Sequence, residues 1–402
     1  MYSAAISGAL LLITAARLFD GTDRVRPARV LLEGDRIAAV GAAARPPEGA
    51  AEIEFAGATI LPGLIDCHVH LVDEGLADAT VRDREPGALR ALRTADHARR
   101  TLEAGFTSVR DVGGRDHLEF GVRMAAREGL IRAPRMTLAG KIVSQTTAGA
   151  RMWRWMYREA DGPWDAVRAV REQIAAGADV IKVMATGAVL APGHERPGAA
   201  QLSPEELRAV VEAAHRSGAS VAAHAHGIDG IRSAVEAGVD TIEHGTHLHE
   251  DRAVAKAMAR RGVFLVPTLK ALGYIADPPG PGVPEEIVAK ARERRADRDT
   301  TFRTALDLGV PIAMGTDAAT PFNRHGENAE ELTLMVSLGM TAEQAIAAST
   351  SVAARAIRSA DAGSLAPGKF ADLAIWDGDA LADIAALRSA PRAVYLGGLR
   401  VV

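Results

Sequence analysis

The sequence predicts an α/β protein: a TIM-type (β/α)8 barrel with a small β-sandwich lobe formed from both chain termini. Two patterns lead to this fold class. The middle of the chain alternates short apolar segments with helical segments rich in Ala, Arg and Glu, whereas both ends consist of strand-like segments split by turns. Repeated strand–helix alternation indicates a parallel sheet. Eight such units in about 300 residues favour a closed barrel over an open doubly wound sheet.

The two ends of the chain are expected to meet in one lobe. Strand-like segments cover residues 11–18, 30–33, 37–40 and 52–55 near the start, and 373–376 and 393–396 near the end. Asp20-Gly21 and Gly34-Asp35 suit tight hairpin turns. Because a few short strands are marginal alone, we expect the ends to pair. We therefore assign residues 1–60 plus 363–402 to the composite β-sandwich lobe and residues 61–362 to the barrel.

The barrel region contains the strand candidates of the predicted parallel sheet. Intervening helices are expected at residues 204–217 and 230–237, among others. The strand candidates end near Asp66, Arg110, Leu138, Lys182, Ala223, Ile242, Val266 and Met314. Barrel enzymes place their catalytic groups at the carboxyl ends of such strands.

Composition excludes several classes of partner. The net charge of −4 argues against nucleic acid, which needs a clustered positive surface. Cys67 is the single cysteine, so no intrachain disulfide can form, and we expect a reducing, cytoplasmic setting. The apolar run 9–13 is too short to span a membrane, and the first basic residue is Arg17, so we expect a strand there and no membrane association. The expected partner is a small-molecule substrate, and a homo-oligomer is left open.

The pair His68-Val69-His70 follows an apolar strand candidate directly. Residues i and i+2 of a strand face the same side, so the two imidazoles should converge. Imidazole is a favoured ligand of zinc, iron, nickel and cobalt. Alone, this pair of histidines is weak evidence for a metal site, because two polar residues at the end of a strand are common.

Further residues with metal-binding or ionisable side chains end other strand candidates. Lys182 lies inside an apolar strand, where a charged amine is costly unless it is neutral, paired or modified. His224, His244 and Asp317 each follow an apolar run. Together with His68 and His70, these residues predict a metal site at the mouth of the barrel.

The sequence resembles the amidohydrolase superfamily over nearly its whole length. The matching segments are LPGLIDCHVH (61–70), GADVIKVMATG (177–187), AHAHG (223–227), IEHGT (242–246), GTD (315–317) and GSLAPGKFADL (363–373). Within this superfamily, the sequence of these segments is most similar to the branch of imidazolonepropionase-like and Xaa-Pro dipeptidase-like enzymes. That branch includes carboxypeptidases acting on N-acyl amino acids and ochratoxin-degrading amidases.

The resemblance implies a binuclear metal centre. Lys182 would be carbamylated by carbon dioxide and would bridge two divalent ions, with zinc expected, although the ligands also suit manganese, cobalt or iron. His68 and His70, with Asp317, would hold one ion, and His224 and His244 the other. A water shared by two cations becomes a nucleophile near neutral pH. Asp317 would take its proton and pass it to the leaving nitrogen.

Several further residues are candidates by the same resemblance. His226 could polarise the substrate carbonyl or replace His224 as a ligand. Thr186 and Gly187 would shape the substrate pocket. Arg110 and Asp111 are interpreted as a structural ion pair, and Cys67 as a small buried filler.

One segment departs from the relatives, which usually carry Gly-Gly-His after the third strand. This chain has TAGARMWRWMY at residues 147–157 instead. Arg151 could capture a substrate carboxylate, since guanidinium binds carboxylates in a bidentate manner. The aromatic residues could wall an apolar pocket or simply anchor the loop.

These observations favour a metal-dependent amidohydrolase that cleaves a C–N bond by attack of a hydroxide bridging two metals. The substrate would be a dipeptide, an N-acyl amino acid or a related amide. The alternatives are hydrolysis of a cyclic amide or imidazolone ring, hydrolysis of a lactone or ester at the same site, and a non-catalytic metal-binding scaffold. Lys182 disfavours the ring hydrolase, which uses one metal, and the intact ligand set disfavours the scaffold.

Overall fold

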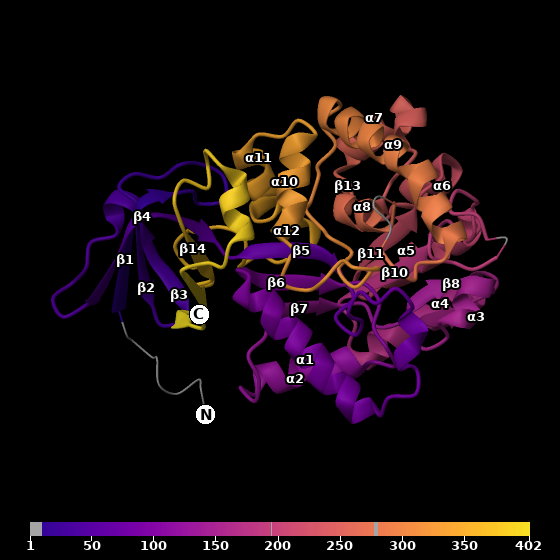
Figure 1. Cartoon of the computed structure of the whole chain (residues 1–402), viewed down its shortest axis with the longest axis horizontal. Coiled ribbons are helices and arrows are strands. Elements are labelled where there is room, and N and C mark those ends of the chain that lie inside the picture. The colour runs from indigo at the N-terminus through magenta and orange to yellow at the C-terminus, as the bar shows by residue number, and fades with distance from the viewer. Residues whose placement is uncertain (1–9, 194, 277–279) are drawn as a thin grey trace.

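The computed structural model describes residues 10–193, 195–276 and 280–402 (Figure 1). In Figure 1, the indigo strands from the N-terminal part lie beside β14 at one end of the molecule, and the remaining strands are surrounded by helices. Ala9, the first residue of the apolar run, lies outside the described residues.

Strands from both chain ends form one seven-stranded sheet. Its order is β16-β15-β14-β4-β1-β2-β3. Its strands are β1 (Leu10–Leu18), β2 (Arg29–Glu33), β3 (Arg36–Val40), β4 (Ala51–Pro62), β14 (Leu373–Asp377), β15 (Ala393–Leu396) and β16 (Leu399–Arg400). The long strand β4 joins the two ends, because it pairs with β1 in parallel and with β14 in antiparallel orientation. The ends therefore meet as expected, whereas the sandwich form and the domain boundaries stay predictions.

The remaining strands pair in parallel, as the strand–helix alternation predicts. They form a three-stranded sheet, β5-β6-β7, and a six-stranded sheet, β13-β12-β11-β10-β8-β9. Their bounds are β5 (Leu64–Val69), β6 (Phe106–Asp111), β7 (Arg135–Leu138), β8 (Ile142–Ser144), β9 (Tyr157–Glu159), β10 (Val180–Met184), β11 (Ser220–Ala225), β12 (Thr241–His244) and β13 (Phe264–Val266). The described core is thus an α/β fold with parallel sheets.

The last predicted strand, ending near Met314, is not a regular strand, so this expectation is wrong. Pro311 has no N–H to give to a ladder, which limits regular pairing there. The segment forms isolated parallel bridges instead, from Ile312 to Leu265 of β13 and from Ala318 to Val69 of β5. It therefore hydrogen-bonds to the last strand of one sheet and to the first strand of the other.

Helices connect and cover the parallel strands. The predicted helix at 204–217 is α5, which begins with a Ser203–Glu206 capping box and Pro204 in its first turn. The α-helices are α1 (Gly87–Glu103), α2 (Leu118–Arg127), α3 (Ala148–Met152), α4 (Pro163–Ala176), α5 (Pro204–Arg216), α6 (Ile228–Ala237), α7 (Arg252–Arg261), α8 (Leu269–Ala276), α9 (Glu285–Asp307), α10 (Glu330–Ser337), α11 (Ala342–Ala348) and α12 (Ser351–Ala356). Within the described ranges, no helix has both the length and the apolar character needed to cross a membrane.

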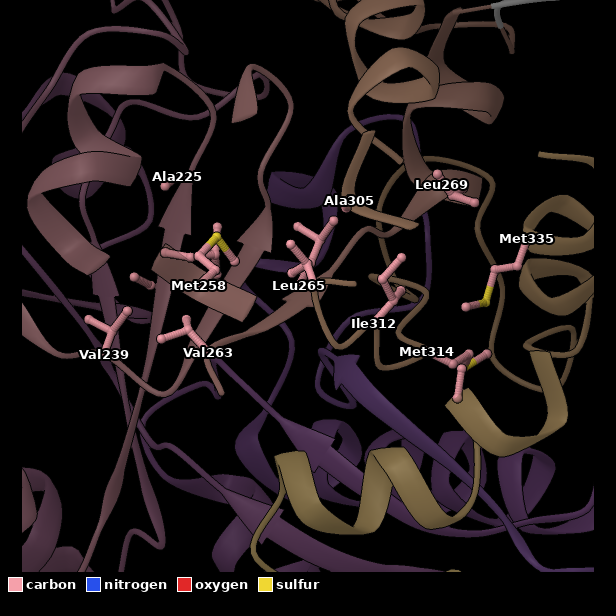
Figure 2. Close-up of a cluster of buried hydrophobic side chains, with 14 of the residues drawn as sticks. Ala225, Val239, Met258, Val263, Leu265, Leu269, Ala305, Ile312, Met314 and Met335 are labelled. Atoms are coloured by element: carbon pink, nitrogen blue, oxygen red, sulfur yellow. The ribbon is translucent and has the colours of Figure 1, made fainter. Parts of the chain in front are cut away.

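The main hydrophobic core lies between the parallel strands and these helices. Figure 2 shows part of it, where Leu265 of β13 and Ile312 lie near Met258 of α7. Met314 and Met335 of α10 continue the same cluster, and all five side chains are buried. This packing holds the strands in a fixed relation, so that side chains at their carboxyl ends have defined positions.

Candidate metal centre and active site

The side chains predicted to form the metal site line one cavity of about 300 Å³. His68 lies in β5 and His70 follows that strand directly, whereas Lys182 lies in β10, His224 in β11 and His244 in β12. The structure brings together all the expected ligands and one further histidine: His68, His70, Lys182, His224, His226, His244 and Asp317.

The first potential ligand group contains His68, His70 and Asp317. The Nε2 atoms of His68 and His70 lie 3.5 Å and 3.3 Å from Asp317 Oδ1. The potential ligand atoms of the three residues all lie within 4.8 Å of one another. Asp317 is held at this position because its backbone N–H donates to His68 O at 2.7 Å. Asp317 has a φ of +56°, in the left-handed region that aspartate tolerates better than most residues.

The second potential ligand group contains His224, His226 and His244, whose ligand atoms also lie within 4.8 Å of one another. The rings of His224 and His244 are 4.5 Å apart between centroids, and those of His226 and His244 are 4.9 Å apart. The His68 ring lies 5.0 Å from that of His244, so the two groups adjoin. The geometry keeps both His224 and His226 as candidate ligands.

Hydrogen bonds orient the histidines and determine the tautomer of three of them. His68 Nδ1 faces Glu243 Oε2 at 2.7 Å, His70 Nδ1 faces Gly113 O at 2.9 Å, and His224 Nε2 faces Gly187 O at 3.0 Å. These oxygens only accept, so each of these nitrogens must donate. The other ring nitrogen of a neutral imidazole then keeps its lone pair for a metal.

The remaining two histidines are held by threonines. His244 Nδ1 lies 2.7 Å from Thr268 Oγ1, and His226 Nδ1 lies 2.6 Å from Thr246 Oγ1. In both cases Nε2 is left to face the cavity. All five histidines therefore show the arrangement typical of metal ligands, with one nitrogen anchored in the protein and the other available.

Burial keeps most of these imidazoles neutral. It lowers the pKa of His68 to about 4 and that of His224 to about 3, with the nearby Lys182 ammonium acting in the same direction. The pKa values of His226 and His244 also lie well below the ordinary range, chiefly because of burial. A metal binds the neutral form of imidazole, so these side chains are ready as ligands at neutral pH.

Lys182 lies in the middle of β10 with its side chain buried. Among the described residues, its Nζ finds no hydrogen-bond partner. Burial lowers its pKa to about 8, although Glu243 and Asp317 oppose the shift. A buried, unpaired amine is costly, so its presence requires an explanation.

Asp317 provides an ionised carboxylate beside this lysine. Burial alone would raise its pKa, but His68, the hydrogen-bonded His70 and Lys182 together hold it well below the usual range of an aspartate. It is therefore ionised at neutral pH and can accept a proton, beside His68 and His70 of the same ligand group.

Sequence reasoning missed Glu243, which is fully buried in β12. Its carboxylate accepts from His68 Nδ1 and, at 2.8 Å, from Arg110 Nη2. Burial alone would raise the pKa of Glu243. The Arg110 guanidinium and the hydrogen bond from His68 nevertheless hold this pKa below its ordinary range. The sequence did carry a signal, because Glu243 is an ionisable residue inside a buried strand, the same argument that selects Lys182.

The expected Arg110–Asp111 ion pair is therefore wrong. Arg110 pairs with Glu243 and also donates from Nε to Cys67 O at 2.6 Å. Asp111 instead accepts from the backbone N–H groups of Leu71 and Gly113. Neighbours along a strand point to opposite faces, so adjacent side chains do not meet. Cys67 is fully buried, as expected of a filler.

Thr186 and Gly187 contact the histidines rather than the cavity. Gly187 O holds His224, and Thr186 Oγ1 accepts from the backbone N–H of His226 at 2.9 Å. Arg151 lies apart from the other candidates. Its side chain is 73% exposed, its Nε lies 3.7 Å from Glu159, and it lines a separate surface hollow.

The segment that departs from the relatives forms part of the cavity wall. Trp153, Trp155, Met156 and Tyr157 all line it. The indole ring of Trp153 stacks on Tyr157 at 6.4 Å between centroids. The aromatic residues therefore wall the pocket, one of the two possibilities that the sequence left open.

Comparison with known proteins agrees with this geometry. Residues 59–401 match the amidohydrolase family. Ochratoxinase of Aspergillus niger is 32% identical over 364 residues, covering 83% of this chain and 73% of that protein. Imidazolonepropionase of Rhizorhabdus wittichii is 30% identical over 400 residues, covering 89% and 88%. A solved Xaa-Pro dipeptidase with methionine in its active site superposes with a TM-score of 0.89 at 33% identity, covering 98% and 99%. The chain therefore belongs to the amidohydrolase family, in the branch of these three relatives, and is a hydrolase acting on carbon–nitrogen bonds.

Proposed function

We propose that the protein is a binuclear metal-dependent hydrolase that cleaves an amide bond in a small molecule, such as a dipeptide, an N-acyl amino acid or a related amide. The observation that carries this proposal is Lys182. Its buried Nζ interacts electrostatically with His68 and Asp317 of the first ligand group and with His224 and His244 of the second. A side chain that adjoins both groups suits a bridging ligand.

The donor set fits two divalent ions, with zinc as the expected metal. His68 and His70 would bind through Nε2, with Asp317, and His224 and His244 would hold the second ion. His224 would bind through Nδ1, because its Nε2 is engaged with Gly187. Lys182 Nζ, as the neutral amine, would combine with carbon dioxide and release a proton, and the oxygens of the resulting carbamate would bind both ions.

The chain's own residues then account for proton transfer. When bound, the cations would polarise the scissile carbonyl and make a water molecule acidic near neutral pH. Asp317 Oδ1 would accept the proton of the attacking water as the C–O bond forms. It would return this proton to the leaving nitrogen as the C–N bond breaks, which yields an acid and an amine. His226 Nε2, held toward the cavity by Thr246, would donate to the carbonyl oxygen.

The positions of the site residues also agree with the closed barrel that the sequence predicts. We propose a closed (β/α)8 barrel, in which the segment after Val310 completes the ring. Supporting bonds run from Ala313 N to Leu265 O at 2.9 Å on one side and from Asp317 N to His68 O at 2.7 Å on the other. Closure would place Asp317 beside the first-strand histidines, as the chemistry requires.

A second candidate activity is hydrolysis of a cyclic amide. The name of one relative, imidazolonepropionase, points to this activity. Esters and lactones could react at the same site. The orphaned Lys182 Nζ supports the binuclear amide hydrolase instead, because the ring hydrolases of this branch use one metal.

The test is metal analysis of the purified protein together with a screen of linear amides, cyclic amides, esters and lactones. Two metal equivalents per chain and turnover that rises with added bicarbonate would support the proposal. One equivalent with turnover of cyclic amides alone would favour the ring hydrolase. Metal binding without any turnover would refute the assignment.

A further inference from the structure

Above the ligand groups, the wall of the cavity is mainly apolar. It is contributed by segments far apart in the sequence, which converge on the same space. Representative lining residues are Trp153, Trp155, Met184, Val189, Leu272 and Ile275. Such a surface binds apolar and aromatic groups, because their transfer from water is favourable.

The charged groups on this wall have one sign. Outside the two ligand groups and Lys182, the acidic and basic side chains among the described lining residues are those of Asp73 and Asp78, both of them carboxyl groups. No arginine is found among the lining residues within the described ranges. Tyr157 offers a neutral hydroxyl, which contacts Met184 Sδ at 4.0 Å.

Of the guanidinium groups near the cavity, that of Arg115 lies behind the aromatic wall, and that of Arg294, which acts electrostatically on His226, is also outside the cavity lining. Arg115 stacks on the Trp155 ring at 3.8 Å and pairs with Asp83. Arg115 and Arg151 line the separate surface hollow, and neither of them lines the cavity. Trp155 lines both the hollow and the cavity. The Trp155 ring therefore separates the Arg115 guanidinium from a substrate in the cavity, and the Arg151 side chain faces the separate hollow.

These contacts bear on the substrate's charge. A carboxylate moved from water into an apolar cavity loses its hydration and needs a cation or several donors in return. Here it would meet mainly apolar walls and the acidic residues Asp73 and Asp78, with no basic side chain among the described lining residues beyond the metal site. An uncharged apolar group of the same size would meet no such penalty.

We propose that the preferred substrates are uncharged amides with an aromatic or similarly bulky apolar group, rather than dipeptides or N-acyl amino acids that carry a free carboxylate. This inference rests on the proposed amide hydrolase function and narrows it. It also removes the role expected of Arg151, because a substrate without a carboxylate needs no such partner.

The test compares two compounds that differ only in the carboxylate: N-phenylacetyl-phenylalanine and N-phenylacetyl-phenethylamine. The kcat/KM of the zinc- and bicarbonate-loaded enzyme is measured for both by the amine released. Their Kd values are measured separately by the change in tryptophan fluorescence, since Trp153 and Trp155 line the cavity. We expect the uncharged compound to have at least a tenfold higher kcat/KM and a tenfold lower Kd.

The outcomes separate this inference from the proposed function. Equal or better turnover of the carboxylate compound would overturn the inference and leave amide hydrolysis intact. Tighter binding of the uncharged compound without turnover of either would support the charge preference of the cavity but refute hydrolysis of these amides, and with it the proposed function. Failure to bind either compound would overturn the inference.

Two variants test the electrostatic cause. Met152 lines the cavity and is 41% exposed, so a longer side chain can be accommodated there. Met152→Arg should improve kcat/KM for the carboxylate compound about tenfold relative to the matched Met152→Gln, and no difference between the two would contradict the explanation. Arg151→Gln should leave the ratio between the compounds unchanged, whereas selective loss of activity toward the carboxylate would overturn the inference.

Discussion

Glu243 should control metal binding without being a ligand. It is fully buried, and its two carboxylate oxygens face His68 Nδ1 at 2.7 Å and Arg110 Nη2 at 2.8 Å. The informative change is Glu243→Gln, which keeps the shape of the side chain. One oxygen becomes an NH₂ group, which cannot accept a hydrogen bond, and the negative charge beside Arg110 is lost.

The expected effects follow from these contacts. Removing one partner of a buried ion pair costs about 3–5 kcal/mol of folding stability, because the other charge is left uncompensated. Loss of the group that orients a histidine ligand typically costs about 10–100-fold in metal affinity. At about 1.4 kcal/mol per factor of ten, this corresponds to roughly 1.4–2.8 kcal/mol of binding free energy.

Stability would be measured by urea denaturation of the metal-free protein, and affinity by competition with a chelator under conditions where the variant is folded. Glu250→Gln is the matched control, since Glu250 also pairs with a histidine, His247, at 2.8 Å, but its side chain is 45% exposed. An exposed ion pair contributes about 1 kcal/mol or less to folding stability. The pair of Glu250 and His247 also lies outside the two ligand groups, so its loss should leave metal affinity unchanged. If Glu243→Gln behaved like the control in both assays, the positioning role would be refuted.

Three further predictions concern ionisable groups. Lys182→Ala should reduce turnover to background, and short carboxylic acids should partly restore it by supplying a bridging anion; full activity of the variant without them would contradict the bridging role. Asp317→Asn should lower kcat by about 10²–10⁴-fold in samples that keep full metal occupancy, as judged by kinetics and metal analysis of the same sample, and a near-normal kcat at full occupancy would rule out the proton shuttle. Burial raises the pKa of Glu119 to about 8 from an ordinary 4.5. Between these pH values the folded protein keeps a proton that the unfolded chain loses. The free energy of unfolding should therefore fall as the pH rises from 4.5 to about 8. Glu119→Gln should remove part of this fall in denaturation experiments at pH 5 and pH 8, and an identical pH dependence in both proteins would argue against it.

Local patterns in the sequence were enough to predict the parallel α/β core and the histidines and the aspartate that the structure gathers into the two potential ligand groups. Strand and helix periods are encoded by neighbouring residues, so α5 begins at Pro204 as its capping signal indicates. The carboxyl ends of parallel strands share one face, which is why His68, Lys182 and His224 could be grouped without knowing their distances. The irregular segment around Pro311 was the exception, because its pairing depends on neighbours distant in sequence.

Only the tertiary structure decided which side chains meet. Arg110 pairs with Glu243, which lies 133 positions along the chain, rather than with its neighbour Asp111. The position of Arg151 outside the cavity, and the acidic and apolar lining of the cavity, likewise depend on how separate loops converge. Periodicity reports which face of an element a residue occupies, whereas partner choice, burial and charge balance arise from long-range packing, which no local pattern contains.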